Sequence, residues 1–471
     1  MKTELTAAYH DVDFLLPVHR FNIRFSYVTN KGLPFIREFI LRLLHISPMT
    51  KLQIANYFGL SANEIEEAIS DLMKRGEVQF IDSGKLGLTF HSRNYFISLG
   101  FPPQLSTVME TGGVFSFELI SFYCVGKGRT NEKWSAGIAL QANNENIANS
   151  EKNAQISFQH QFYEILEKGF IPQVRNNEAA EKPSIYTVES VNKLGQEPIR
   201  LSVEFRIDED GMPVERADFN ILTDSSLVHE SITSTLSNIY VSSNIPDIAS
   251  AMNLLEDKET QKFLTNNSVD LRLLSDSLSS ENLDNYSRSY FLGPIYKRDN
   301  WKSLVNIIND ILNSDSNILD FIWVAPSDVF WGKSLKWLSC VEDFFNQAAS
   351  NEKKVLYSPK LFLPICGEKD KKGIKDWRKD LKSYDKGLYG LLEGLLNGCV
   401  EILLIPGKLA VICYHIRYPN ALPVTLPLGF FTKELDVISK VEKVVNEYLV
   451  GFQAFDKPNN LGLLKDLVDK N

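Results

Sequence analysis

The chain has 471 residues and a mass of 53.5 kDa, with 44% hydrophobic and 23% charged side chains. These values exclude wholesale disorder, collagen and coiled coils, and predict about three or four domains with separate cores. No apolar run approaches the ~18 residues that span a bilayer, so we expect no membrane association. The formal net charge of −9 excludes a chain-wide basic surface for nucleic acid.

The negative charge is concentrated in one segment. Residues 207–320 carry 8 basic and 19 acidic side chains, whereas the two ends of the chain are slightly basic. An acidic centre repels phosphate over about 8–10 Å at physiological ionic strength. Any nucleic-acid contact is therefore expected near the chain's ends, and the pI near 5.5 favours protein partners.

The cysteines and the N-terminus indicate a reduced compartment. The chain begins without a basic stretch followed by an apolar one, so no secretion signal is expected. Five widely spaced cysteines without a CxxC pair are typical of a reduced, cytoplasmic chain. They are Cys124, Cys340, Cys366, Cys399 and Cys413.

Residues 33–90 carry the strongest local signals. Apolar residues at helical spacing predict a first helix from Leu33 to Leu44. Thr50 with Gln53 and Ser61 with Glu64 are capping boxes, and each predicts the start of a further helix. These signals predict three consecutive short helices.

A hairpin is expected directly after the third helix. Gly76 fits the left-handed position that ends a helix, and Glu77–Asp82 and Leu86–Phe90 are expected strands. Three helices followed by a hairpin resemble the winged helix-turn-helix family over about residues 33–92. The residues that carry this resemblance are Ile54, Ala55, Leu60, Ser61, Ile65, Ala68, Ile69, Leu72, Gly76 and Val78.

The resemblance implies that the third helix enters the major groove of DNA. This helix offers Glu64, Glu66, Glu67 and Asp71, and four carboxylates facing phosphates are unfavourable. We interpret these carboxylates as a surface that binds a protein partner. Two alternatives remain open: sequence-specific DNA recognition by this helix, and contact of the expected hairpin, the wing, with the DNA backbone. The cations expected to contact nucleic acid here are Lys51, Lys74, Arg75, Lys85 and Arg93.

Residues 101–225 are expected to form a β-rich α+β domain. Val114–Cys124 and Trp134–Leu140 are predicted to pair as strands, and Ser150–Lys168 is a predicted helix. A three-stranded meander is expected to follow, with turns near Gly195 and at Asp208–Gly211. Its strands are Ser184–Asn192, Pro198–Ile207 and Met212–Leu222.

The rest of the chain is expected to be an acidic helical connecting region, residues 226–315, and a C-terminal α/β domain, residues 316–471. Thr265–Tyr286 is polar enough to be a partly mobile connection. From Leu319 onward strands and helices alternate, which indicates a partly parallel sheet, with a helix expected at Tyr389–Leu396. The other two expected domains are the winged helix at 1–100 and the β-rich domain at 101–225. The expected fold class is therefore a multidomain protein of mixed α/β and α+β structure.

Lys369–Lys386 is the densest basic stretch, with eight basic and four acidic residues. Trp377 among the cations is suited to stack on a base while the cations hold phosphate. Ion pairs such as Lys372–Asp376 and Asp376–Lys379 on a solvated helix explain the pattern equally well. The candidate nucleic-acid-binding residues are Lys371, Lys372, Lys375, Trp377, Arg378, Lys379 and Lys382.

The order of elements near the C-terminus is similar to one half of a phospholipase D-like phosphodiesterase. The matching segment is LAVICYHIRYP followed by PLGFF. The resemblance implies a nucleophilic His and a Lys at the positions of Leu409 and Val411, and a Ser at Phe430, so the site would be inactive. His415 stands at the wrong spacing and is interpreted as a core or edge histidine.

Other catalytic and metal patterns are incomplete. Cys413-x-His415 lacks a second pair at ligand spacing, so no zinc site is expected, and no phosphate-binding GxxxxGK[ST] loop exists. Glu204, Glu215 and Asp218 lie on expected neighbouring strands and are the one carboxylate group worth testing as a metal site. No catalytic residue, cofactor or metal is therefore assigned, and enzymatic activity is not expected.

These observations favour a non-enzymatic winged-helix adaptor, or a DNA-associated subunit, of a prokaryotic multiprotein assembly in antiviral defence or DNA maintenance. A transcription regulator with ligand-sensing domains and an unrecognised or degenerate nuclease remain the alternatives.

Overall fold

The computed structural model describes residues 6–31, 35–81, 84–96, 103, 105–174, 183–208, 212–214, 222, 225–239, 242–265, 270, 272–274, 277, 288–314, 318–346, 357–451 and 457–469. The chain forms two compact units. Unit 1 comprises residues 1–17, 131–143 and 197–471, and unit 2 comprises residues 18–130 and 144–196. Helices and sheets occur in both, which confirms the mixed fold class. The boundaries differ from the expected four-part division because two long strands each contribute residues to both units.

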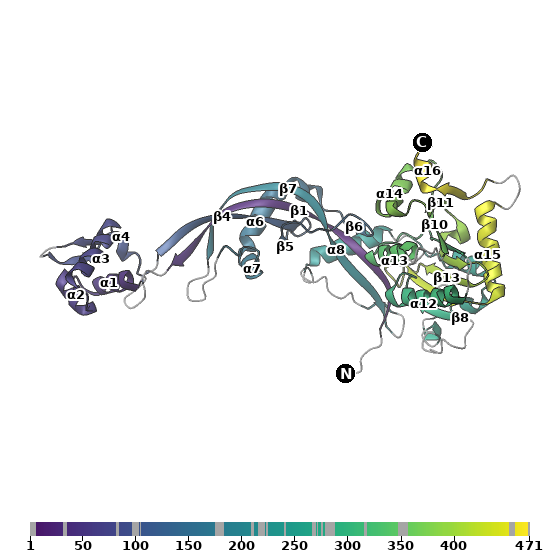
Figure 1. Cartoon of the computed structure of the whole chain (residues 1–471), viewed down its shortest axis with the longest axis horizontal. Coiled ribbons are helices and arrows are strands. Elements are labelled where there is room, and N and C mark those ends of the chain that lie inside the picture. The colour runs from purple at the N-terminus through teal and green to yellow at the C-terminus, as the bar shows by residue number, and fades with distance from the viewer. Residues whose placement is uncertain are drawn as a thin grey trace. The chain divides into compact units, whose positions relative to one another are not determined.

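Unit 2 contains a three-helix segment, residues 35–96, which we describe by itself (Figure 1). Its elements are α1 (Phe35–Ile46), α2 (Lys51–Phe58), α3 (Ala62–Lys74), β2 (Val78–Phe80), β3 (Leu86–Leu88) and α4 (Phe90–Arg93). Strands β2 and β3 pair antiparallel, with Val78 opposite Leu88. The predicted order of three helices and a hairpin is confirmed.

Local signals in the sequence determine where these helices begin and end. Both predicted capping boxes form at Thr50 and Ser61. Gly59 and Gly76 adopt left-handed φ angles of 68° after α2 and near the end of α3, a conformation that glycine enters at little cost. The apolar faces meet in one core, which includes Ile40, Ile54, Ala55, Ile65, Ile69, Leu72 and Leu86.

The remainder of unit 2 is a twisted antiparallel sheet with helices packed on it. The described elements are β1 (Ala7–Lys31), β4 (Leu105–Glu118), β5 (Cys124–Lys127), α5 (Asn144–Ala148), α6 (Ser150–His160), α7 (Phe162–Glu167) and β7 (Ser184–Ile207). Strands β1 and β4 pair in register from Val18–Glu118 to Lys31–Leu105. Phe158 of α6 packs against Phe25 and Phe115, with ring centroids 4.9 and 5.0 Å apart.

Three expectations for this region are wrong in detail. Residues 184–207 form one continuous strand, because Gly195 lies in extended backbone and makes no turn. The predicted helix at 150–168 is interrupted at Gln161. Residues Ile138–Ala139 form β6, which pairs parallel with Phe14 and Leu15 of β1 and not with β4.

Unit 1 is built on a sheet that has eight strands within the described residues. They are β8 (Arg288–Leu292), β9 (Leu319–Val324), β10 (Tyr357–Ile365), β11 (Leu388–Leu392), β12 (Val400–Ile405), β13 (Leu409–Ile416), β14 (Leu426–Thr432) and β15 (Asn460–Leu463). The spatial order is β15-β11-β10-β9-β12-β13-β14-β8. Strands β9, β10 and β11 run parallel, and β12, β13, β14 and β8 continue antiparallel. The expected partly parallel sheet is confirmed.

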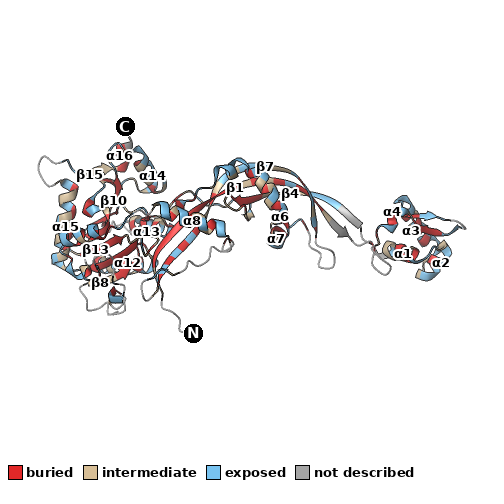
Figure 2. Ribbon diagram, turned by 180° about the vertical axis from the view of Figure 1, so that it is seen from behind, coloured by how far each residue is buried: buried red, intermediate tan, exposed pale blue. Residues whose placement is uncertain are grey.

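Helices cover both faces of this sheet. On one face pack α12 (Arg298–Ser314), α13 (Leu335–Asn346), α14 (Lys371–Leu381) and α16 (Leu464–Asp469). Against β13 on the other face lie α9 (Ile245–Leu254) and α15 (Leu435–Val450). Strands covered on both faces read as continuous apolar runs, and all residues of β12, β13 and β14 are buried. Strand β13 is labelled in Figure 2, where buried residues are red.

Two predictions for unit 1 are wrong, and others lie outside the described residues. The expected helix at Tyr389–Leu396 is strand β11 followed by a 3₁₀ turn, because apolar runs buried on both faces do not distinguish strand from helix. The region expected to be helical and connecting contains α8 (Ser226–Ile239), α9 and α10 (Lys258–Gln261), but also β8, a strand of the sheet. Most of Met212–Leu222 and of Thr265–Tyr286 lies outside the described residues.

None of the helices within the described residues combines the length and the apolar character that crossing a membrane requires.

Candidate functional site

The acidic helix α3 begins with a carboxylate that serves its own backbone. Ser61 Oγ accepts a hydrogen bond from Glu64 N at 3.3 Å, and Glu64 Oε2 accepts one from Ser61 N at 2.8 Å. The backbone hydrogen bond from Ser61 lowers the pKa of Glu64. Glu64 therefore stabilises the N-terminus of the helix, and its carboxylate is already hydrogen-bonded to Ser61 when a partner binds.

Two of the expected DNA-contacting cations are paired with expected partner-binding carboxylates. Lys51 Nζ lies 2.7 Å from Glu66 Oε2 and 5.5 Å from the centre of the Phe80 ring. Arg75 Nε lies 2.8 Å from Asp71 Oδ2, and the hydrogen bond to Asp71 raises the pKa of Arg75. The positive charges of Lys51 and Arg75 are thus neutralised within the segment.

Glu67, Lys74 and Lys85 have a different environment. All three are exposed, and none of their side chains forms an ion pair or a hydrogen bond with the residues that the structure describes. Glu67 therefore presents an uncompensated negative charge on α3, whereas Lys74 lies at its C-terminal end and Lys85 between β2 and β3.

Large apolar side chains are exposed around this acidic surface. Leu52 and Tyr57 of α2 are 70% and 69% exposed, and Phe80 of β2 is 50% exposed. Since Lys51 contacts both Phe80 and Glu66, these two residues lie close together. We call Leu52, Tyr57, Phe80, Glu66 and Glu67 the α2–α3 surface.

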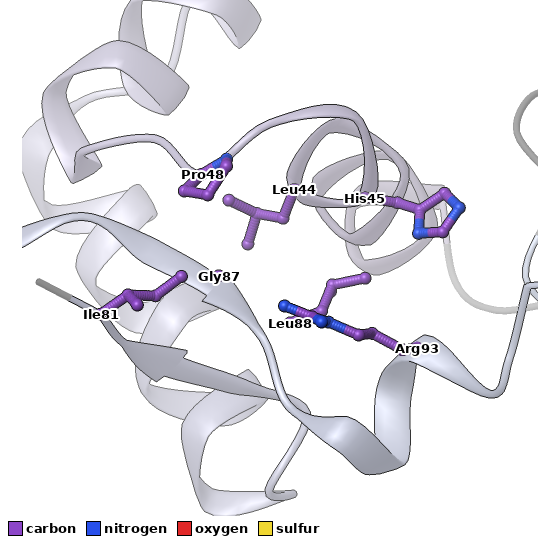
Figure 3. Close-up of a pocket in the computed structure, with 7 residues that line it drawn as sticks. All are labelled: Leu44, His45, Pro48, Ile81, Gly87, Leu88 and Arg93. Carbon is purple, nitrogen blue, oxygen red and sulfur yellow. The ribbon is translucent and has the colours of Figure 1, made fainter.

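A small pocket lies beside the hairpin of the three-helix segment (Figure 3). Its volume is about 230 Å³, and Arg93 lines it from α4 opposite His45 of α1. The His45 ring stacks on Phe96 with centroids 4.2 Å apart. Arg93, expected to touch phosphate, thus lines a concave site. The other lining residues are Leu44, Pro48, Ile81, Gly87 and Leu88.

The basic helix α14 is fixed to the core of unit 1 by its tryptophan. Trp377 Nε1 donates to Pro364 O at 3.0 Å, and the ring packs against Trp331 and Trp337 with centroids 5.8 and 6.1 Å apart. Asp370 caps the helix by accepting from Gly373 N at 2.9 Å. Trp377 therefore orients α14, and its partly buried ring is poorly placed for the expected base stacking.

The cations of α14 line a groove of about 560 Å³. Arg378 is held by Asp385 through bonds of 3.0 and 2.7 Å, and Lys379 Nζ donates to Trp134 O at 2.5 Å. Among the described residues, neither of the expected ion pairs of Asp376, with Lys372 and Lys379, forms. The groove residues are Lys371, Ile374, Lys375, Arg378, Lys379, Lys382 and Leu467.

A buried polar cluster lies in unit 1 where β9, β12 and β13 meet. Glu401, at the start of β12, is 0% exposed, and its Oε1 accepts hydrogen bonds from Trp323 Nε1 and Trp331 Nε1, both at 2.8 Å. Its Oε2 lies 3.2 Å from Nε2 of His415, near the end of β13. Cys413 stands directly opposite Glu401 in the strand register.

A second carboxylate faces the other nitrogen of the same imidazole. Asp328 Oδ2 lies 3.6 Å from His415 Nδ1, and Asp328 Oδ1 accepts from Thr425 Oγ1 at 2.9 Å. Burial lowers the pKa of His415, but Cys413, Asp328 and Glu401 outweigh burial and raise it well above its ordinary value. One imidazole is thus placed between two buried carboxylates.

The neighbours of this cluster are also buried. Burial raises the pKa of the Cys413 thiol to about 11 and lowers the pKa of His10, on β1, to about 4. The backbone around His415 is held firmly, because its N–H donates to Cys399 O at 2.8 Å and its carbonyl accepts from Asn244 Nδ2 at 2.9 Å. These bonds fix the position of the His415 backbone beside Glu401.

The other expected sites are less well formed. Leu409 and Val411, at the positions of the phosphodiesterase residues, are buried within β13. Glu204 pairs with Arg206 at 2.9 Å on an exposed part of β7, and Glu215 and Asp218 lie outside the described residues. Among the described residues the structure brings together Glu401, Cys413 and His415 instead.

Sequence reasoning missed Glu401 because it sought ligands in local spacing. The pair Cys413-x-His415 was noticed and set aside for want of partners. The hairpin turn at Pro406-Gly407 contained the missing signal, since counting the register back from it places Glu401 opposite Cys413.

No known protein-family model matches this sequence, and no curated protein matches it significantly.

Proposed function

We propose that this chain is a non-enzymatic winged-helix adaptor, or DNA-associated subunit, of a prokaryotic multiprotein assembly in antiviral defence or DNA maintenance. In this proposal the three-helix segment is a winged helix whose α2–α3 surface docks on protein. The single observation that best supports it is the pairing of Lys51 with Glu66 and of Arg75 with Asp71. A groove-reading helix needs free cations, and here two of them are engaged.

The chemistry of the surface defines the partner. Leu52, Tyr57 and Phe80 offer apolar contact area, and exposed aromatic residues are frequent anchors of protein interfaces. Glu67 of α3 adds an exposed, uncompensated negative charge. The expected occupant is therefore a protein surface that places lysine or arginine next to apolar side chains. Duplex DNA offers neither feature, because its outer surface is a row of phosphates.

Site-specific photo-crosslinking in the native host tests this docking. A photoreactive phenylalanine analogue replaces Tyr57, and the matched control places it at Tyr186 of β7, which is 67% exposed. We expect a discrete protein adduct from position 57 and none from position 186. Glu67→Lys and Leu52→Ser should each reduce the adduct at least fivefold, whereas Glu189→Lys and Leu194→Ser, exposed on β7, should not.

The same variants distinguish docking from DNA reading. Glu67→Lys should raise non-specific DNA affinity, since it adds a cation beside Lys74. A wild-type chain that protects one defined DNA sequence at physiological salt, or that crosslinks from position 57 to DNA, would refute the docking proposal and favour a transcription regulator.

The groove of α14 supports the DNA-associated form of the proposal. Lys372 and Lys375 make no ion pair with the described residues, so their charges are free to meet phosphate. In a salt titration of DNA binding, Lys372→Glu with Lys375→Glu should flatten the slope of log affinity against log salt by about 0.7–0.9 for each lost contact. The control pair Lys433→Glu and Lys457→Glu, both exposed in unit 1, should leave the slope unchanged.

A further inference from the structure

Three side chains of different donor type converge in the dry interior of unit 1. One ligand atom each from Glu401, Cys413 and His415 lies within 4.8 Å of the others, and all three residues are buried. Burying a carboxylate beside a thiol and an imidazole is costly unless a proton or a cation balances the charge. The cluster has no lysine or arginine among the hydrogen-bond and ion-pair partners that the structure describes for it.

We propose that Glu401 Oε2, Cys413 Sγ and His415 Nε2 bind one divalent transition-metal ion of the Zn²⁺ class. Thiolate and imidazole ligands select such an ion over Mg²⁺ or Ca²⁺, which prefer oxygen ligands. With bonds of about 2.0–2.1 Å, two ligands of a tetrahedral ion lie about 3.3 Å apart. The distance from Glu401 Oε2 to His415 Nε2 is 3.2 Å.

The surrounding hydrogen bonds fit the outer shell of a metal site. Trp323 and Trp331 both donate to Glu401 Oε1, which leaves Oε2 as the free ligand atom. Asp328 lies beside His415 Nδ1 and is itself oriented by Thr425. A carboxylate behind the distal nitrogen of a ligating histidine fixes the ring and its tautomer.

The ion also neutralises the charges of its two anionic ligands. Binding releases the thiol proton of Cys413 and any proton on His415 Nε2, so a dication meets one thiolate and one carboxylate. His415 then keeps one proton on Nδ1, the nitrogen that faces Asp328 Oδ2 at 3.6 Å. Without an ion, an imidazolium held between Glu401 and Asp328 is the competing arrangement.

The ion would stabilise the contact of strands β9, β12 and β13 with the loop that connects β9 to α13. Glu401 and His415 belong to neighbouring strands β12 and β13, and Trp331 and Asp328 lie in the loop that connects β9 to α13. The site is buried and has three protein ligands, and it is independent of the function proposed above.

Metal analysis of the full-length protein tests the site. The chain is purified without chelator or affinity metal, and zinc is measured by inductively coupled plasma mass spectrometry. We expect about one zinc per chain, and about one Co²⁺ after exchange, with the near-ultraviolet charge-transfer band that a thiolate ligand produces. Cys413→Ser should abolish this band.

Two other cysteines provide the controls. Cys366→Ser removes the exposed thiol and Cys340→Ser removes a buried thiol outside the cluster, and both variants should keep the ion and the band. If Cys413→Ser fails to fold, the Co²⁺ spectra of the wild type and of Cys366→Ser still test the metal-site proposal. Less than about a tenth of an equivalent of either metal, a cobalt spectrum without the thiolate band, or a band that survives Cys413→Ser would overturn the proposal.

Discussion

The three-helix segment and the C-terminal sheet each bury a glutamate, and they solve the same electrostatic problem differently. Glu77, between α3 and β2, is 1% exposed and pairs with Arg37 of α1, whose Nε donates to Oε2 at 2.8 Å. Tyr95 OH also donates to Glu77, at 3.3 Å. A permanent cation of the same segment therefore balances this carboxylate.

Among the described residues, Glu401 has no lysine or arginine partner. Two indole N–H groups and one imidazole hold it, and the imidazole is shared with a second carboxylate, Asp328. Indole groups donate hydrogen bonds but carry no charge. The comparison therefore indicates that an arginine neutralises the charge of a buried carboxylate permanently. A carboxylate beside histidine and cysteine needs a proton or a metal ion to neutralise its charge.

The largest expected effect is at Glu401. Glu401→Leu leaves Trp323 Nε1, Trp331 Nε1 and His415 without their shared acceptor, and removal of one partner from a buried charged network costs about 3–5 kcal/mol of unfolding free energy. The measurement is urea unfolding of the full chain followed by tryptophan fluorescence, with amide exchange of β12 and β13 as a local readout.

Glu442→Leu is the control for that change. Glu442 lies on α15 and accepts a hydrogen bond from Gly407 N at the surface, so its loss should alter stability far less. A Glu401→Leu chain as stable as the Glu442→Leu chain would show that the cluster contributes nothing to folding.

A smaller effect is expected at Arg37. Arg37→Met leaves Glu77 buried with Tyr95 as its remaining side-chain donor, but the edge position of Arg37, 16% exposed, lets water reach the carboxylate. We expect a loss of about 2–3 kcal/mol, local to the three-helix segment. Faster amide exchange in β2 and β3, with an unchanged exchange rate in β12 and β13, would confirm this prediction.

A double substitution sharpens this second prediction. Glu77→Gln in the Arg37→Met background removes the uncompensated charge and should restore part of the lost stability. An additive, further loss would mean that Glu77 is stabilised by something other than Arg37.

The segment was predictable because its determinants are local. The caps at Thr50 and Ser61 and the left-handed glycines at 59 and 76 lie within one or two turns of the helices that they bound. Each signal acts over three or four residues, which is the range over which sequence patterns are informative.

The sheet was only partly predictable because its pairings are long-range. Strand β1 escaped notice since His10, Asp11 and Asp13 interrupt its apolar pattern, although all three are buried. Strand β11 was taken for a helix because parallel strands covered on both faces lack the alternation that identifies a strand.

The candidate sites divide in the same way. The charges of α3 and α14 were read directly from the sequence, but their internal pairing, such as Lys51 with Glu66 across fifteen residues, required the fold. The cluster of Glu401, Cys413 and His415 depends on strand register, and Asp328 joins it from a loop more than seventy residues earlier. No local pattern contains that information.

The smallest effect on stability is expected where the carboxylate is exposed. Asp71 and Arg75 pair on the surface of α3 with about half of each side chain accessible. Exposed pairs of this kind exchange one hydrated interaction for another, so Asp71→Asn should leave the amide exchange of α3 unchanged within replicate scatter.

The same substitution, however, frees the guanidinium of Arg75 to bind a phosphate. We expect the salt slope of non-specific DNA binding to steepen by about 0.9 if that contact forms. Asp436→Asn on α15 removes an equal charge elsewhere and serves as the control. An unchanged slope with Asp71→Asn would mean that pairing with Asp71 is not what keeps Arg75 from DNA, and would remove the main support for reading this surface as one built for protein.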